Sequence, residues 1–338
     1  MKIAYFLEDT EIAGGIRVAV AHADALIERG HDVTLATKGG TLTWRSSRAN
    51  WIHVKEWDDV DVTQFDFVVG TFWKTIFDTY RLAADRAIHL CQGYEGSFTA
   101  YQSLKNEIDA AYRLPIPKIT VSPHLVDICR AFHDDAEYVG QIVDEIFYSS
   151  GGWAPSPVRV LLVGPAQADF KGIDIGYEAV RLARETGAQF DLVRVSQWYG
   201  EENEPSDLAQ EFHVAIDSTQ MANVIASSTI FLGPSRRQEG FGLPAAESLA
   251  SGVACVLSEI PSFLSWDASR DFALFTPEGD AAAMSRALIQ LLDDDALRAQ
   301  LAKRGREVVE QFRAEKTGER LERYFLSRVK ARTSSGGR

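Results

Sequence analysis

The residues with the clearest chemical potential lie in the segment Thr229–Pro261. Two carboxylates, Glu239 and Glu247, stand with seven residues between them, and the first leads into the turn Gly240-Phe241-Gly242-Leu243, which Pro244 follows. Proline is favoured at the first position of a helix, where its missing N–H would be unpaired anyway. The glycines allow a ligand to approach the backbone closely. A helix N-terminus behind such a turn is an anion site.

Carboxylates repel an anion, so their place beside an anion site needs a second explanation. They fit there if both accept hydrogen bonds from hydroxyl groups. A ligand with phosphate in the middle and hydroxyls at both ends meets this requirement, and a nucleotide sugar is such a ligand. One rival interpretation is a dinucleotide site, since Gly240-x-Gly242-x-x-Ala245 matches that fingerprint. However, several loop residues separate the match from the preceding strand, and the first strand of the chain has no such glycines. The other alternative is that both glutamates are solvated acids at a helix edge.

The stretch EGFGLPAAESLASG, continued by VACVLSEIPSF, resembles the Glu-x7-Glu signature of glycosyltransferase family 4. Members of that family are retaining enzymes with the GT-B fold, in which two doubly wound, Rossmann-like parallel-sheet domains face a cleft. The resemblance implies that Glu239 lies near the transferred sugar and that Glu247 binds the ribose hydroxyls of the donor. It also implies that the backbone at Phe241–Gly242 faces the sugar or the diphosphate, with Gly240 and Leu243 in the same donor-binding turn.

A second match is the segment GPAQADFKGID, which runs from Gly164 to Asp174. It resembles the family's Gly-Arg…Lys-Gly loop, whose two cations hold the diphosphate. Lys171 occupies the lysine position, so the resemblance implies that it stabilises the leaving diphosphate. The arginine position reads Pro165, and we expect Arg236 or its neighbour Arg237 to replace the missing cation. The alternatives are a weakened donor site and a Lys171 that is only an exposed lysine at a helix start.

Three shorter segments complete the candidate site. Gly14-Gly15 precedes a helix, where the family has a glycine-rich loop over the diphosphate, although such a pair is usually only a turn. Cys91-Gln92-Gly93-Tyr94-Glu95 resembles a segment of a bacterial rhamnosyltransferase-like subset, which implies that Gln92, Tyr94 and Glu95 lie on the acceptor or sugar side. The loop at Ala215–Asp217 is the candidate contact for the donor's base.

The elements that must position these residues alternate along the chain. Compact apolar runs predict buried strands at 2–7, 31–36, 65–70, 87–91 and 119–122, and again at 158–163, 190–195, 229–232 and 253–257. Helical stretches separate them, which predicts an α/β protein with two parallel sheets in tandem. The Gly/Pro/Ser-rich segment 148–157 is the expected linker between an acceptor-side domain, 1–150, and a nucleotide-sugar-binding domain, 151–314. Three further helical stretches follow, the last of which, 315–330, is expected to pack back on the first domain.

Composition sets limits on the function. The 338 residues include 35 basic and 48 acidic side chains, a net charge of −13, which disfavours nucleic acid as a partner. Three widely spaced cysteines disfavour a disulfide framework or a zinc site, and no His-x-x-x-His pair points to another metal. The N-terminus has no signal-peptide pattern, and no apolar run approaches the length that spans a bilayer. We therefore expect a cytoplasmic protein that uses neither a metal nor a cofactor, with its oligomeric state open.

Together these features predict a metal-independent, retaining glycosyltransferase that acts in glycan or polysaccharide biosynthesis. It would move a hexosyl or deoxyhexosyl group from a nucleotide-diphosphate sugar to an acceptor hydroxyl. The acceptor could be a glycan, a small molecule or a lipid-linked compound, and a lipid-linked one would involve weak peripheral membrane association. Two alternatives stay open: a catalytically silent partner subunit of the same fold, and a nucleotide-sugar epimerase. An oxidoreductase is disfavoured, because no glycine fingerprint follows the first strand.

Overall fold

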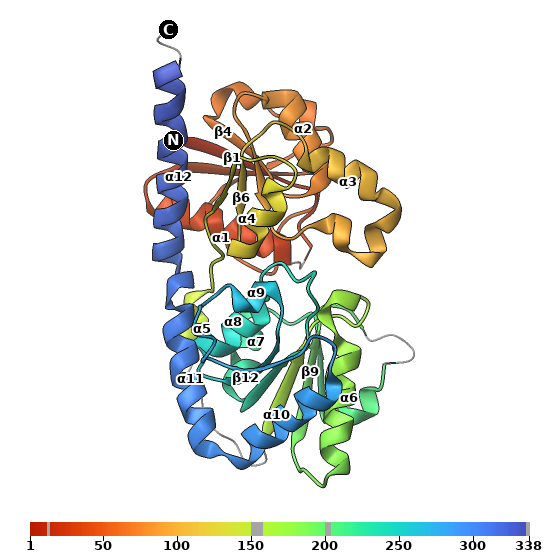
Figure 1. Ribbon diagram of the computed structural model, residues 1–338. Coiled ribbons are helices and arrows are strands. Elements are labelled where there is room, and N and C mark those ends of the chain that lie inside the picture. The colour runs from red at the N-terminus through yellow and green to blue at the C-terminus, as the bar shows by residue number, and fades with distance from the viewer. Residues whose placement is uncertain (12–13, 150–157, 200–203, 336–338) are drawn as a thin grey trace. The chain divides into compact units, whose positions relative to one another are not determined.

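The structure is a computed structural model that describes residues 1–11, 14–149, 158–199 and 204–335. The chain divides into two compact units (Figure 1). Unit 1 comprises residues 1–142 and 311–338, and unit 2 comprises residues 143–310. The expected linker at 148–157 lies for the most part outside the described residues. The short helix α5 (Glu145–Ser149), which the sequence places in the first domain, is part of unit 2.

Unit 1 is built on a parallel seven-stranded sheet with the order β3-β2-β1-β4-β5-β6-β7. Its strands are β1 (Lys2–Leu7), β2 (Asp32–Thr37), β3 (Asn50–His53), β4 (Phe67–Gly70), β5 (Ala87–Cys91), β6 (Lys118–Thr120) and β7 (Ala136–Tyr138). The helices of this unit are α1 (Gly14–Glu28), α2 (Trp73–Ala83), α3 (Lys105–Tyr112), α4 (Pro123–Arg130) and α12 (Ala314–Ser335). Residues 3–7 of β1 are wholly buried, as expected for a parallel strand with both faces covered.

Unit 2 has a parallel six-stranded sheet with the order β10-β9-β8-β11-β12-β13. Its strands are β8 (Arg159–Val163), β9 (Asp191–Ser196), β10 (Glu211–Val214), β11 (Ile230–Gly233), β12 (Ala254–Ser258) and β13 (Leu274–Thr276). Besides α5, its helices are α6 (Ile173–Glu185), α7 (Ser218–Ala226), α8 (Leu243–Ala250), α9 (Pro261–Leu264), α10 (Ala281–Asp293) and α11 (Asp295–Val309).

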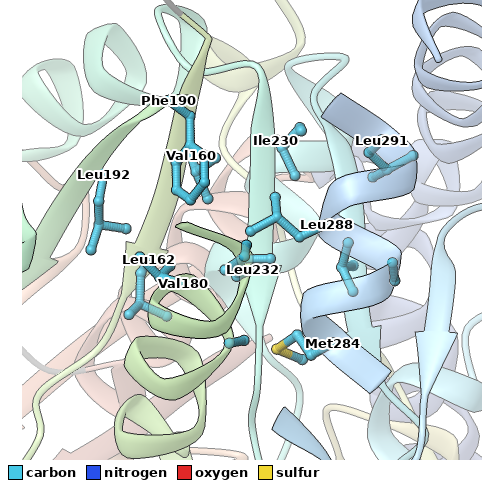
Figure 2. Close-up of a cluster of buried hydrophobic side chains, with 14 of the residues drawn as sticks. Val160, Leu162, Val180, Phe190, Leu192, Ile230, Leu232, Met284, Leu288 and Leu291 are labelled. Atoms are coloured by element: carbon cyan, nitrogen blue, oxygen red, sulfur yellow. The ribbon is translucent and has the colours of Figure 1, made fainter. Parts of the chain in front are cut away.

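The core of unit 2 forms where α6 and α10 cover one face of its sheet (Figure 2). Alternate residues of a strand point to the same face, so Val160 and Leu162 of β8 lie beside Ile230 and Leu232 of β11. Val180 of α6 and Met284, Leu288 and Leu291 of α10 complete the cluster (Figure 2). This packing fixes the central strands, β8 and β11, whose following loops carry the candidate site.

The last helix, α12, packs against α1 within unit 1. At Gly318 the two helices come so close that an added Cβ would lie 3.3 Å from the Cβ of Ala25. Glu322 forms an ion pair with Arg29 of α1 at 2.5 Å, and the Thr317 hydroxyl donates to the carbonyl of Gln141 at 3.0 Å. Residues 311–338 therefore return the chain to the unit in which it began.

Candidate functional site

The central feature of unit 2 is an ion pair between two loops that follow neighbouring strands. Strands β8 and β11 pair directly, so the loops at their carboxyl ends meet at one edge of the sheet. Lys171 ends a 3-10 turn after β8, and its Nζ lies 2.7 Å from Oε2 of Glu239, which follows β11. The hydroxyl of Ser235 donates to the same oxygen at 3.1 Å. Glu239 is only 6% exposed, so these contacts hold its charge in a largely buried place.

The backbones of these two loops are joined as well as their side chains. The N–H of Arg236 donates to the carbonyl of Phe170 at 2.7 Å. Gly172, with φ +60°, caps the N-terminus of α6 directly after Lys171, and an added Cβ there would lie 2.1 Å from the carbonyl oxygen of Pro234. Only glycine fits this position, because any other residue would be strained and would clash. The Lys171–Glu239 geometry is therefore set by backbone contacts rather than by the two side chains alone.

The glycine turn before α8 is equally constrained. Gly242 caps α8 with φ +88°, and an added Cβ would lie 2.2 Å from the Phe263 ring. The Ser262 hydroxyl donates to the carbonyl of Phe241 at 2.7 Å, which ties the turn to α9. Gly240 is buried and Leu243 is the first residue of α8. Pro244 is thus the second helical residue, one position later than its propensity for the first position predicts.

The two glutamates of the signature differ in their surroundings. Glu239 lies on the loop, whereas Glu247 is inside α8 and is 0% exposed. A solvated acid at a helix edge would be exposed, so neither glutamate fits that alternative. The structure thus places both carboxylates within one short stretch of unit 2, but on different elements: one carboxylate beside a lysine, the other enclosed by the packing of a helix.

The candidate second cations are also paired with carboxylates. The Arg236 guanidinium lies 2.7 Å from Asp174 of α6, and that of Arg237 lies 2.8 Å from Glu278. Arg236 is partly exposed and sits on the loop that bonds to Phe170, so it lies beside the turn that carries Lys171. Pro165, at the position where the family has an arginine, is buried and its carbonyl accepts from the N–H of Ala168.

In unit 1 the structure brings Gly15 and Gln92 together. An added Cβ on Gly15 would lie 3.4 Å from the side-chain amide of Gln92, whereas no atom of the described residues lies within 4 Å of a Cβ added to Gly14. The Gln92 amide nitrogen donates to the carbonyl of Thr71 at 3.1 Å. The start of α1 and the segment after β5 are therefore neighbours, although nearly eighty residues separate them in the sequence.

Tyr94 and Glu95 are occupied by contacts within unit 1. The Tyr94 hydroxyl donates to the carboxylate of Asp109, which also forms an ion pair with Lys105 at 2.8 Å. The Tyr112 hydroxyl donates to Oε2 of Glu95 at 2.6 Å, and the backbone N–H of Trp73 at the start of α2 donates to the same carboxylate. Burial raises the pKa of Glu95 from 4.5 to about 7, because a low-polarity environment disfavours the charged form.

At the outer side of the unit 2 sheet, Ala215 has φ +51°, a conformation that non-glycine residues rarely adopt. It follows β10, and its N–H donates to the carbonyl of Ser196 at the end of β9.

The sequence did not single out Ser235 and Asp174, which contact Glu239 and Arg236. Ser235 is four residues before Glu239 and Asp174 is three residues after Lys171. This closeness in the sequence is the signal that could have indicated them.

The described residues bear on two further expectations, which concern a membrane span and a metal site. Among those residues, no helix is both long and apolar enough to cross a membrane. The same residues contain no group of three or more His, Cys, Asp and Glu side chains arranged to hold a metal ion.

Comparisons with known proteins identify sequences and folds that are similar to this chain. Residues 199–308 match the family Glycosyl transferases group 1. A phosphatidyl-myo-inositol mannosyltransferase of Mycolicibacterium smegmatis is 33% identical over 97 residues, which cover 29% of this chain and 25% of that protein. An N-acetyl-alpha-D-glucosaminyl L-malate synthase of Bacillus anthracis is 34% identical over 97 residues, with 28% and 25% covered. The matched part thus spans about a quarter of the length of these curated relatives.

The similarity in fold extends over nearly the whole chain. The Anabaena protein HepE, solved in complex with UDP-glucose, superposes with a TM-score of 0.78 at 13% identity, covering 97% of this chain and 100% of that one. This superposition confirms the predicted GT-B fold. The match over residues 199–308 confirms, for that part of the chain, the resemblance to glycosyltransferases that the Glu-x7-Glu segment indicated. Assignment to a rhamnosyltransferase-like subset stays a prediction.

Proposed function

We propose that this protein is a retaining glycosyltransferase that moves a sugar from a nucleotide-diphosphate sugar to an acceptor hydroxyl in glycan or polysaccharide synthesis. The observation that carries the proposal is the Lys171–Glu239 pair, held by backbone contacts at neighbouring strand ends. The family match over residues 199–308 supports it, because that stretch includes both signature glutamates.

In the proposed reaction, the acceptor oxygen bonds to the anomeric carbon as the bond from that carbon to the diphosphate breaks. The acceptor's proton passes to the departing phosphate, and in this proposal no metal or cofactor takes part. Lys171 and the N-termini of α6 and α8 stabilise the negative charge that develops on the diphosphate. Arg236 supplies a second cation by exchanging Asp174 for a phosphate oxygen.

The carboxylates take separate roles in this proposal. Among the described residues, Lys171 and Ser235 both donate to Oε2 of Glu239, and we assign Oε1 to accept a hydroxyl of the transferred sugar. Glu247 accepts from the ribose hydroxyls, and the turn Gly240–Leu243 faces the sugar and the diphosphate. In unit 1 we assign Gly14 and Gly15 to the donor and Gln92 to the acceptor or sugar side. Tyr94 and Glu95 hold the Gln92 segment in place.

The test is a binding and turnover series with the full chain. Calorimetry with UDP-, GDP-, ADP- and dTDP-sugars is expected to identify one donor that binds, and nucleotide release is then measured with and without glycan, lipid-linked and small-molecule acceptors. Acceptor-dependent release that Glu239→Gln abolishes supports the proposal. Donor binding without release under any condition would assign the silent-subunit role that Pro165 keeps open, and conversion of the donor without an acceptor would assign an epimerase.

A further inference from the structure

The loop after β9 presents an unusual surface. Among the described residues, the large hydrophobic side chains that are exposed are Trp198 at 48%, Tyr199 at 83% and Leu326 at 43%. Single exposed apolar residues are common on protein surfaces, but two consecutive aromatic side chains at the carboxyl end of a parallel strand stand where open α/β sheets bind ligands.

This loop is anchored by a buried ion pair. Arg194 of β9 and Glu204, on the far side of the loop, lie 2.9 Å apart, with side chains 0% and 2% exposed. The Tyr177 hydroxyl of α6 donates to Glu204 at 2.9 Å, and the Arg194 guanidinium lies over the rings of Tyr177 and Phe212. Burying two charges carries a desolvation penalty, so this ion pair by itself is weak evidence that it stabilises the fold. The pair joins β9, the strand that leads to Trp198 and Tyr199, to Glu204.

The position of the pair relates it to the proposed donor site. Strand β9 lies between β8 and β10. On one side, the Gln167 amide, in the loop that leads to Lys171, donates to the carbonyl of Tyr199 at 2.9 Å. On the other side, the carbonyl of Ser196 accepts from the N–H of Ala215, the residue with the strained backbone. The aromatic pair thus stands between the proposed diphosphate loop and the candidate base contact, all within unit 2.

We infer that Trp198 and Tyr199 form the platform on which the nucleobase of the donor stacks. The inference rests on the proposed function and adds the residues that recognise one part of the donor. Planar aromatic faces suit a nucleobase because stacking needs only a π-face and tolerates every base. A base is also the one flat, weakly hydrated part of a nucleotide sugar, whereas the diphosphate and the sugar need charged and hydroxyl-binding groups such as Lys171 and Glu239.

The experiment compares ligands with and without a base. Calorimetry measures the Kd of UDP, GDP, ADP, dTDP and inorganic pyrophosphate with the wild type, Trp198→Ala, Tyr199→Ala and the double variant. We expect the double variant to bind the preferred nucleoside diphosphate at least about 10-fold more weakly, with pyrophosphate affinity unchanged. Trp198→Phe combined with Tyr199→Phe should restore binding to within about threefold, since it keeps both rings. Leu326→Ala, at an exposed apolar site on α12, is the control and should change neither affinity.

Each other outcome overturns the inference. Nucleoside diphosphate affinity in the double variant equal to that of the wild type would show that the rings do not contact the base. An equal loss of affinity for pyrophosphate would show that the two rings only position the loop that contains Gln167 and leads to Lys171. Loss of binding to anionic phospholipid vesicles, with nucleotide affinity retained, would assign the pair to a membrane surface. A wild type that binds no nucleoside diphosphate would remove the proposed function as well, whereas intact binding in all variants removes the platform alone.

Discussion

The two units place polar residues at the carboxyl ends of their strands, but these residues have different partners. In unit 2, Lys171 and Glu239 come from separate loops and contact each other across neighbouring strands. In unit 1, Tyr94 and Glu95 bond to α2 and α3, the helices beside their own strand. In the proposed function, the loop-to-loop pair of unit 2 acts on the ligand. The contacts of Tyr94 and Glu95 with α2 and α3 hold the segment after β5.

The sharpest way to break this contrast is to remove each buried carboxylate in turn. Glu239→Gln is expected to lower kcat at least about 100-fold and to keep the donor KM within about threefold of the wild-type value, because it weakens contacts made to the reacting sugar. Glu247→Gln should instead raise the donor KM about 10-fold, and Glu95→Gln should leave both within about threefold. Steady-state nucleotide release gives all three values. Equal effects at Glu239 and Glu95 would contradict the difference between the units.

Two glycines at helix starts offer a matched comparison of stability. Gly242→Ala is expected to cost about 3 kcal/mol or more, since it combines a left-handed backbone with a clash against Phe263. Gly14→Ala should change stability by less than about 1 kcal/mol, because in the described part of the chain no atom lies within 4 Å of the added one. Chemical denaturation at a fixed temperature measures both. A neutral Gly242→Ala would mean that the turn before α8 is free to rearrange.

The Glu95 carboxyl should give unit 1 a pH-dependent stability. Its pKa is about 7 in the folded protein and about 4.5 in the unfolded chain, so the folded state keeps a proton that the unfolded state has lost. Its contribution is therefore full below about pH 4.5 and is lost as the pH rises through 7. Relative to Glu95→Gln, the wild type should lose about 1–3 kcal/mol between pH 5 and pH 8. Parallel denaturation curves at the two pH values test this, and a constant difference between the proteins would contradict it.

The smallest expected effect concerns the exposed part of the same region. Lys105 is nearly half exposed, and its pair with Asp109 is accessible to water. Lys105→Met should move the midpoint of thermal unfolding by no more than about 2 °C, because solvent screens such a pair. Thermal melts with and without added salt provide the measurement. A large decrease in this midpoint would show that the Tyr94–Asp109–Lys105 contacts contribute more to the stability of unit 1 than their exposure indicates.

How much of the fold could be predicted depended on where each strand lies in its sheet. All nine strands predicted from apolar runs are present, with bounds shifted by up to two residues. Four described strands were not predicted, namely β3, β7, β10 and β13, and each is the edge strand of its sheet. Edge strands are covered on fewer sides, so their sequences, such as NWIH and EFHV, mix polar with apolar residues. Hydrophobic pattern alone therefore indicated the centre of each sheet but not its limits.

The candidate site shows the same limit. The spacing of Glu239, the glycines and Glu247 is a local pattern, and it could be read directly. The contact from Lys171 to Glu239 spans 68 residues, and only the pairing of β8 with β11 creates it. Likewise, nothing in the order Gln92, Tyr94, Glu95 reveals that two of these side chains are satisfied by α2 and α3. Partners of this kind follow from tertiary packing.

The return of α12 to α1 means that unit 1 is made of two pieces of chain, with all of unit 2 inserted between them. A ribosome delivers residues 143–310 before the helix that covers α1 exists. Unit 2 can therefore complete its core during synthesis, whereas the N-terminal sheet must wait with an apolar helix face uncovered. A truncation that removes α12 therefore damages unit 1, although the deleted residues follow unit 2 in the sequence.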